Sequence, residues 1–132
     1  MIVTDDRVLG FAEAALGTTF LPPCTVMGWE RDGEIVSAVV FNNYTGPNVE
    51  VTAVGASWPR SFMREIGRYV FTQLGCLRLT FTVEDDAVAA YAMRLGGRVE
   101  GLMRDYFGPG RDATIIGILK ADWPIPHEGT CQ

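Results

Sequence analysis

The sequence predicts an α/β (α+β) fold, with a mixed, mostly antiparallel central sheet and helices on both faces. Two hairpin signals, RDGE at residues 31–34 and GPGR at residues 108–111, each join two runs rich in apolar residues. An amphipathic segment over residues 59–74 separates two apolar strands, so those strands should lie parallel and be joined by a right-handed crossover. With 132 residues and 48% hydrophobic content, residues 1–132 are expected to form a single domain.

The N-terminal half predicts one helix followed by a meander of three strands. Apolar residues recur at helical spacing over residues 5–16, and Asp5 or Asp6 can cap the helix. The prolines of the GTTFLPP segment end it, because proline cannot continue a helix. Strands are expected over residues 25–31, 34–44 and 49–56.

The C-terminal half predicts alternating helices and strands. The helix over residues 59–74 ends at Gly75, and a second helix begins at a cap on Asp85 or Asp86 and runs through Leu95. In open α/β sheets, ligands bind outside the carboxyl ends of neighbouring strands that diverge, so the best pocket is expected at the end of the 49–56 strand. The remaining strands are expected over residues 77–83, 98–107 and 112–121.

Composition excludes several classes of partner. The formal net charge is −5 and no basic block is present, which argues against nucleic acid or an anionic membrane as the main partner. No apolar run reaches the roughly 18 residues of a membrane span, and the N-terminus lacks the basic start of a secretory signal, so the expected location is cytoplasmic. The three cysteines are an odd, widely spaced set, which favours reduced thiols over a disulfide framework or a zinc site, and no metal is expected.

The C-terminal half resembles the Gcn5-related N-acetyltransferase (GNAT) family. The segment RLGG stands where the family has a Leu-Gly-Phe helix end, VEGLMRD matches its Glu-Gly-x-x-Arg strand, and RDATIIGILKADW is similar to its final strand. The meander and the strand after the central helix are similar to a small, bacteriophage-encoded branch of the family. The resemblance covers about residues 24–123, and residues 124–132 are expected to form a tail.

Several residues depart from the family's pattern. The family's glycine-rich pyrophosphate loop is replaced by the shorter, glycine-free ASWPRSFMR, which makes the loop degenerate. The tyrosine that many members use as a general acid would fall at Ala92, with Tyr91 one residue early, and the Phe of Leu-Gly-Phe is Gly97. The family's N-terminal strand is not evident, so the fold is expected to be a GNAT-like acyl-CoA N-acyltransferase fold that is shortened at its N-terminus.

The resemblance implies transfer of an acetyl group from acetyl-CoA to an amine. The pantetheine arm is expected to pair with the strand edge at Val54, Gly55 and Ala56, and a backbone N–H there would stabilise the thioester oxygen. Glu50, earlier on that strand, is the candidate general base, although a solvent-facing or ion-paired glutamate would fit as well.

The same resemblance places the rest of the cofactor site around two helix starts. The first turn of the 59–74 helix would take the pyrophosphate, with arginine charge in place of the missing glycines. Asp85 replaces the Asn that heads the family's next helix, and Tyr91 would touch the sulfur end of the cofactor or serve as a core aromatic. The first-turn residues are Arg60, Ser61, Phe62, Met63 and Arg64.

Three readings of function remain open. The first is an N-acetyltransferase whose acceptor is a small molecule, a peptide or a protein, with a cationic acceptor favoured by the negative net charge. The second is a catalytically degenerate GNAT-fold protein that acts by binding a partner protein. The third is an unrelated α+β binding module. Exposed sheet edges allow a homodimer in each of them.

Overall fold

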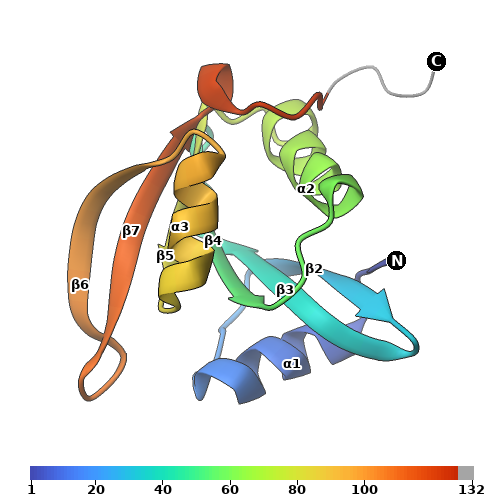
Figure 1. The fold of residues 1–132 in the computed structure, drawn as a ribbon, viewed down its shortest axis with the longest axis vertical. Helices are drawn as coiled ribbons and strands as arrows, with labels where there is room; N and C mark the ends of the chain where they lie inside the picture. Colours follow the sequence, from blue (N-terminus) through green and yellow to red (C-terminus); the bar gives the residue numbers. More distant parts are fainter. Residues whose placement is uncertain (128–132) are drawn as a thin grey trace.

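The computed structural model describes residues 1–127, which form one seven-stranded sheet with three α-helices (Figure 1). The strand order in the sheet is β1-β2-β3-β4-β5-β7-β6. The strands are β1 (Ile2–Val3), β2 (Cys24–Arg31), β3 (Glu34–Asn42), β4 (Asn48–Gly55), β5 (Arg78–Val83), β6 (Arg98–Gly108) and β7 (Arg111–Leu119). The α-helices are α1 (Asp6–Leu16), α2 (Arg60–Gly67) and α3 (Asp86–Arg94).

All neighbouring strands are antiparallel except β4 and β5, which are parallel. These two strands are connected through α2, which confirms the crossover predicted from the amphipathic segment. The sheet is therefore mixed and mostly antiparallel, as predicted. The parallel pair lies at the centre of the strand order, and its parallel direction puts the carboxyl ends of β4 and β5 at the same edge of the sheet.

Helices cover both faces of the sheet (Figure 1). On one face, Val8 and Ala12 of α1 pack against Ala38 and Val40 of β3. On the other face, α2 and α3 cover the larger core, which contains residues such as Phe62 of α2. Cys76 belongs to this core and is fully buried. No helix within residues 1–127 is long and apolar enough to cross a bilayer.

The main element boundaries follow the predictions, with three differences. A short strand, β1, precedes α1 and pairs with β2, so the expectation that no N-terminal strand is present was wrong. Strand β3 ends at Asn42 instead of residue 44, because Asn43 has a φ of 53° and leaves the extended region. Helix α2 continues as a π-helical segment, Arg68–Gln73, so the predicted helix has the right extent but not one regular geometry.

Gly97, which stands where the family has a phenylalanine, is fixed by close packing. A Cβ at Gly97 would lie 2.5 Å from Cγ2 of Ile116 and 2.7 Å from the carbonyl oxygen of Ala92. The chain therefore passes too close to β7 for any side chain. Close packing therefore accounts for the glycine at this position.

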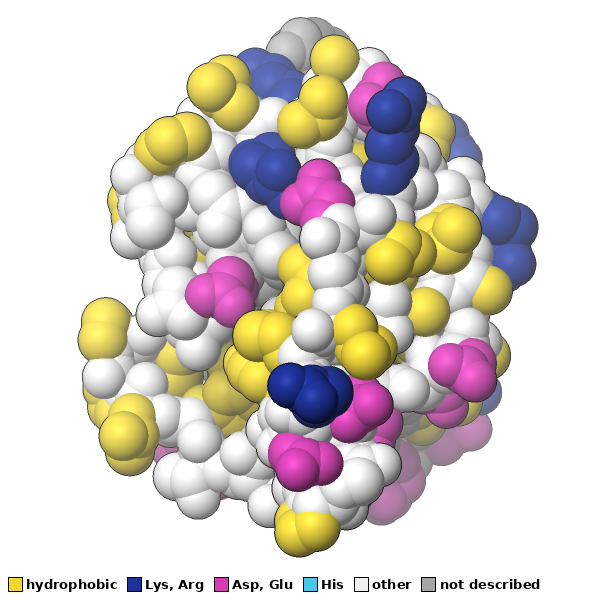
Figure 2. Space-filling view, turned by 90° about the vertical axis from the view of Figure 1, so that its left-hand side faces the viewer, with side chains coloured by type: hydrophobic (Ala, Val, Ile, Leu, Met, Phe, Trp, Pro, Cys, Tyr) yellow, Lys and Arg dark blue, Asp and Glu magenta, His cyan; other side chains and the backbone are white. Residues whose placement is uncertain are grey.

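Strand β6 is one edge of the sheet, and Figure 2 shows the side of the molecule on which it lies. Hydrophobic side chains lie there among both acidic and basic ones (Figure 2). Val99 and Leu102 of β6 are 55% and 59% exposed. An edge of this kind is open to pairing with a second chain.

Candidate functional site

Strands β4 and β5 separate before either strand ends. Their parallel pairing runs from Asn48 opposite Arg78 to Thr52 opposite Thr82 and stops there. Strand β4 nevertheless continues to pair with β3 as far as Gly55. The segment from Ala53 to Gly55 therefore has β3 on one side and no strand on the other, and we call the space on that side the notch. The predicted divergence of the two parallel strands is confirmed.

Gly55 allows β4 to leave the sheet. Its φ is 129°, a conformation that other residues rarely adopt. A Cβ at this position would lie 2.5 Å from the carbonyl oxygen of Val36 and closer still to the Cα of Ser37. Both neighbours are backbone atoms of β3, which cannot move aside independently. The glycine is therefore required by the geometry that ends β4.

One of the three candidate backbone donors faces the notch. Ala56 donates its N–H to the carbonyl oxygen of Val36, at 3.2 Å, across β3. Successive backbone N–H groups in an antiparallel ladder point in opposite directions. The N–H of Val54 therefore also points toward β3, and the N–H of Gly55 points toward the notch. The site predicted at Val54, Gly55 and Ala56 thus narrows to a single N–H, that of Gly55.

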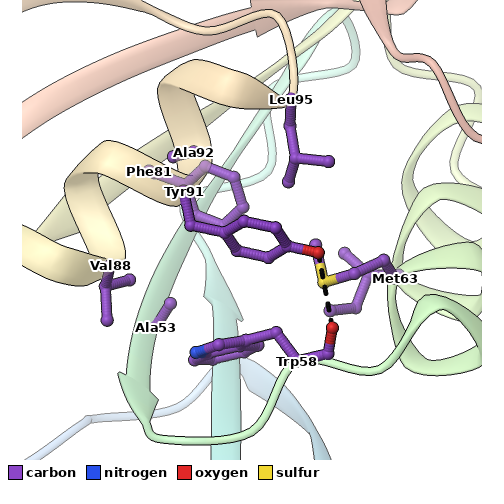
Figure 3. Close-up of a pocket in the computed structure, with 9 residues that line it drawn as sticks. Ala53, Trp58, Met63, Phe81, Val88, Tyr91, Ala92 and Leu95 are labelled. Atoms are coloured by element: carbon purple, nitrogen blue, oxygen red, sulfur yellow. Dashed lines mark hydrogen bonds between the residues drawn. The ribbon is translucent and has the colours of Figure 1, made fainter.

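Two aromatic residues fill the inner part of the notch (Figure 3). The ring of Trp58, from the loop between β4 and α2, stacks on Phe62 with centroids 5.7 Å apart and an angle of 2° between the planes. The Tyr91 hydroxyl donates to the carbonyl oxygen of Trp58 at 3.3 Å. The remaining cavity, whose floor includes Ala53 and Phe81, has a volume of about 10 Å³. That is room for about one water molecule, so an acyl chain does not fit this cavity while the side chains that line it stay in place.

An open groove of about 440 Å³ lies outside this aromatic pair, between the end of β4 and the start of α3. Gly55, Ala56, Asp85, Tyr91 and Arg94 all contribute to its walls. Four of these five were predicted as cofactor-binding residues; Arg94, whose guanidinium lies 5.5 Å from the centroid of the Tyr91 ring, was not. The groove therefore brings together residues from β4 and α3 that are about 30 positions apart in the sequence.

Asp85 caps α3, as its position in the sequence predicted. Its Oδ1 accepts the backbone N–H groups of Ala87 and Val88, at 2.7 and 3.3 Å. These are two of the N–H groups that a helix leaves unpaired at its start. Because the carboxylate already occupies them, the start of α3 has less capacity to hold a phosphate, and we expect Asp85 to act as a cap beside the ligand.

The start of α2 offers fewer donors than expected. Phe62 and Met63 both donate their N–H groups to the carbonyl oxygen of Pro59, at 3.0 Å each. Their side chains are buried in the core. Neither residue presents a group to the groove, so the N–H groups of Arg60 and Ser61 are the ones that this turn leaves for an anion. Arg60, Ser61 and Arg64 are exposed.

Polar residues gather on the α1 face of β4 and β5. Glu50 accepts a hydrogen bond from the side-chain amide of Asn43, and the hydroxyls of Thr52 and Thr82 are 2.9 Å apart and buried. Tyr106, on β6, joins this group. Burial and then the negative charge of Glu50 raise the pKa of its phenol, and a hydrogen bond with Thr82 partly offsets that rise.

Sequence reasoning missed Tyr106. The register between β6 and β7 shifts twice, and the second shift lies between Met103 and Gly108. A simple alternation of side chains along β6 therefore does not predict which way residue 106 points. No signal in the sequence itself connects this tyrosine with Glu50.

An ion pair fixes the end of β5 next to the groove. Arg111 of β7 donates to both carboxylate oxygens of Glu84, at 2.7 Å each. These hydrogen bonds, more than the opposite charge itself, hold the pKa of Glu84 below its ordinary value. Glu84 directly precedes Asp85, so the ion pair positions the start of α3 relative to β7.

We expect Glu84→Gln to lower the free energy of unfolding by about 0.5–1 kcal/mol at neutral pH, because the pair is about one-third exposed. The pKa of Glu84 is depressed in the folded state, so the contribution is present above its unfolded pKa and is lost as the pH falls through its folded pKa. Urea unfolding of both proteins between pH 3 and pH 7, with about one pH unit between measurements, checks this. A difference that stays constant to the acid end would contradict it, and Glu34→Gln, at an exposed hairpin residue, is the control.

No three His, Cys, Asp or Glu side chains within residues 1–127 gather in a way that could hold a metal ion.

No protein-family model matches the chain, and no curated protein matches it in sequence. Solved structures do match its fold. A mutant of spermidine N-acetyltransferase SpeG from Vibrio cholerae superposes with a TM-score of 0.69 at 14% identity, over 94% of this chain and 95% of that chain. The fold is that of the GNAT N-acetyltransferases.

Two further structures have the same GNAT fold. Spermidine/spermine N-acetyltransferase SpeG from Vibrio cholerae in complex with manganese ions has a TM-score of 0.68 at 15% identity, over 92% of both chains. A putative acetyltransferase from T. thermophilus has a TM-score of 0.64 at 19% identity, over 87% of this chain and 67% of that chain. At these identities the likeness establishes the GNAT fold, and the function has to be argued from the site.

Within this GNAT fold, the predicted site residues fall into three places. Gly55, Ala56, Asp85 and Tyr91 line the outer groove. Glu50 lies on the opposite face of the sheet. The arginines of α2 lie at the surface beyond the loop that carries Trp58. The outer groove gathers four of the predicted residues, and it does not include Glu50 or the arginines of α2.

Proposed function

We propose that this chain is an acetyl-CoA-dependent N-acetyltransferase that transfers the acetyl group to an amine. The observation that carries the proposal is the notch, where the unpaired edge of β4 presents the N–H of Gly55 on the strand that also carries Glu50. The pantetheine arm would pair with this edge like an added strand. Acetyl-CoA supplies the thioester, and the chain supplies the donor and the base.

Gly55 and Glu50 have separate tasks in this reaction. The N–H of Gly55 donates to the thioester oxygen as negative charge develops on it, and one such donor contributes about 2.7–4 kcal/mol. Glu50 takes the proton of the acceptor amine, directly or through water, so that the nitrogen can attack the carbonyl carbon. The C–N bond forms and the C–S bond breaks. The thiolate, whose ordinary pKa is about 8.5, then leaves and takes a proton from water.

The fit of the cofactor depends on Trp58 and on the arginines of α2. Arg60 and Arg64 would hold the pyrophosphate by charge, together with the N–H groups of Arg60 and Ser61, in place of a glycine-rich loop. The pantetheine arm would occupy the space that the ring of Trp58 fills in this structure. Binding would therefore displace that ring, and the energy of the displacement reduces the apparent affinity.

The closed notch favours a second candidate function. A chain that keeps the GNAT fold while Trp58 and Tyr91 close its notch could act by binding a partner protein, without acetyl transfer. The exposed edge of β6 would then be a contact surface, for a partner or for a second copy of the chain. For either function we propose the cytoplasm as the compartment. The free thiols of Cys24 and Cys76 support it.

Glu50→Gln tests the proposed chemistry. We expect the variant to lower kcat by about 100-fold, because the amine loses its base, while the dissociation constant for acetyl-CoA stays within about twofold. Mass spectrometry of acetylated products, formed from labelled acetyl-CoA and a panel of amines, measures turnover. Glu34→Gln, which removes an exposed carboxylate from the hairpin, serves as the control. Equal turnover in the Glu50 variant would remove Glu50 from the mechanism.

A further inference from the structure

A second groove, of about 970 Å³, opens on the chain near Glu50. Its walls come from the loop between α1 and β2, from the end of β3, from β6, from the start of β4, and from the π-helical segment that follows α2. We call it the aromatic groove because six aromatic side chains line it: Phe20, Phe41, Tyr44, Tyr69, Tyr106 and Phe107. Tyr106 and Phe107 meet edge to face, with centroids 4.9 Å apart, so two of these rings hold each other in place.

The charged side chains near the aromatic groove determine whether it favours a cationic or an anionic ligand. No Lys, Arg, Asp or Glu is among the residues that line it. Two of the lining residues, Asn43 and Tyr106, interact with Glu50. Asn43 donates a hydrogen bond to its carboxylate, and the negative charge of that carboxylate contributes to the raised pKa of Tyr106. Within residues 1–127, no Lys or Arg forms an ion pair with Glu50. A cation in the groove would therefore have one carboxylate without an ion-pair partner close behind the wall, and an anion would meet no positive side chain.

Aromatic rings and a single carboxylate together suit a particular kind of molecule. Aromatic faces attract ammonium groups and bury flat apolar surface. A polyamine, by contrast, needs several carboxylates to compensate its charges, and this groove has one beside it. The composition of the walls thus favours one positive charge on an apolar body.

We propose that the aromatic groove is the acceptor site and that it takes a primary ammonium with a single charge on an aromatic body. The assignment as acceptor site rests on the proposed acetyl transfer, since Glu50 would be both the counter-ion of the bound ammonium and the base that takes its proton. Recognition of the ammonium itself does not require acetyl-CoA. Tyr106 is then a residue that contacts the bound ligand beside Glu50 and holds it in the groove.

Titration calorimetry with three probes, in the absence of acetyl-CoA, tests the recognition. Phenethylammonium should bind, 3-phenylpropionate should bind at least about tenfold more weakly because its charge is reversed, and spermidine should also bind more weakly than phenethylammonium. Glu50→Gln should weaken phenethylammonium binding by about tenfold, whereas Glu34→Gln should leave it unchanged. Thermal melts confirm that each variant is folded. Tighter binding of the anion or of spermidine, or unchanged binding in the Glu50 variant, would overturn the assignment.

Acetylation assays separate this inference from the proposed function. If phenethylammonium binds in a Glu50-dependent way and is not acetylated, the groove binds the ligand class we propose and acetyl transfer fails. If amines are acetylated but Phe107→Ala and Tyr106→Phe change neither KM nor the preference for an aromatic acceptor, acetyl transfer stands and the groove is not the acceptor site. A raised KM for phenethylammonium in Tyr106→Phe, with kcat at saturation nearly unchanged, is the expected result for a residue that positions the ligand.

Discussion

Gly55→Ala is expected to lower the free energy of unfolding by about 3 kcal/mol, which for a chain of this size corresponds to a fall of roughly 10 °C in Tm. Two costs add. The residue has a φ of 129°, which alanine adopts only under strain, and the new Cβ would meet backbone atoms of Val36 and Ser37 at 2.5 Å or less. Relief of that overlap would move the N–H of residue 55, so acetyl transfer should fall further than stability alone explains.

Gly46→Ala is the matched control. Gly46 also has a positive φ, of 97°, but a Cβ there would meet no atom within 4 Å. The variant should therefore lose only about 1 kcal/mol, the cost of the backbone conformation alone. Urea unfolding of both variants measures the difference. Equal losses in the two variants would show that β4 does not need a glycine at its end, and the geometry of the notch would have to be revised.

Trp58→Ala is expected to raise the affinity for acetyl-CoA by about tenfold. The ring of Trp58 stacks on Phe62 and fills the space that the pantetheine arm would take, so binding to the unchanged protein first has to displace it. The variant has no ring to displace, so the free energy of that displacement no longer opposes binding. We take this free energy to be about that of one buried aromatic contact. The same variant should have a lower free energy of unfolding, because Phe62 loses the stacked ring of Trp58. Titration calorimetry with acetyl-CoA measures the affinity.

Trp29→Ala distinguishes opening of the notch from general loosening. Trp29 of β2 also contacts Phe62, with centroids 5.9 Å apart, but it does not line the notch. We expect this variant to lose stability without any gain in affinity. A similar gain in both variants, or a loss of affinity in Trp58→Ala, would contradict the role of Trp58 as an obstacle to the cofactor.

Much of the fold was predictable because its signals are local. The Asp-Gly turn between β2 and β3, the Asp85 cap and the apolar stripe of α2 each depend on a few consecutive residues, and the structure has all of them. The parallel pairing of β4 and β5 followed from the crossover alone. The end of β4 could therefore be named as the pocket from the order of elements.

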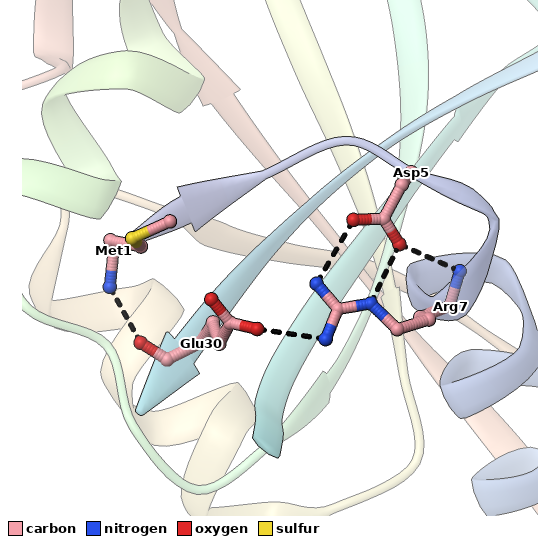
Figure 4. A network of polar contacts seen from close by, with 4 residues as sticks. All are labelled: Met1, Asp5, Arg7 and Glu30. Atoms are coloured by element: carbon pink, nitrogen blue, oxygen red, sulfur yellow. Dashed lines mark hydrogen bonds and ion pairs between the residues drawn. The ribbon is translucent and has the colours of Figure 1, made fainter. Parts of the chain in front are cut away.

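Strand β1 was not predictable, because two residues carry no periodic pattern. Polar contacts of the residues on either side of it, two of them to Glu30 of β2, accompany its pairing (Figure 4). The backbone nitrogen of Met1 donates to the carbonyl oxygen of Glu30 at 2.6 Å, and the Arg7 guanidinium contacts both Asp5 and Glu30. The hydrogen bonds from Arg7 hold the pKa of the Asp5 carboxyl below its ordinary value.

The contents of the site were harder to predict than its position. Trp58 was read as part of a loop, and nothing in the sequence around it shows that its ring turns inward to Phe62. The nearness of Tyr106 to Glu50 depends on register shifts in β6 that arise from the pairing of whole strands. Side-chain direction in loops and bulged strands is decided by tertiary packing, and the sequence pattern of one element does not contain it.

Binding of acetyl-CoA is the claim on which the proposed function depends. The direct measurement is titration calorimetry of acetyl-CoA into the unchanged protein, with thermal shift alongside, since a ligand at 100 times its dissociation constant adds about 2.7 kcal/mol to stability. We predict saturable binding at one site per chain, and a loss of about tenfold or more in affinity when Arg60→Ala and Arg64→Ala are combined. No heat and no thermal shift at millimolar acetyl-CoA, in folded samples of both the unchanged protein and Trp58→Ala, would contradict the account.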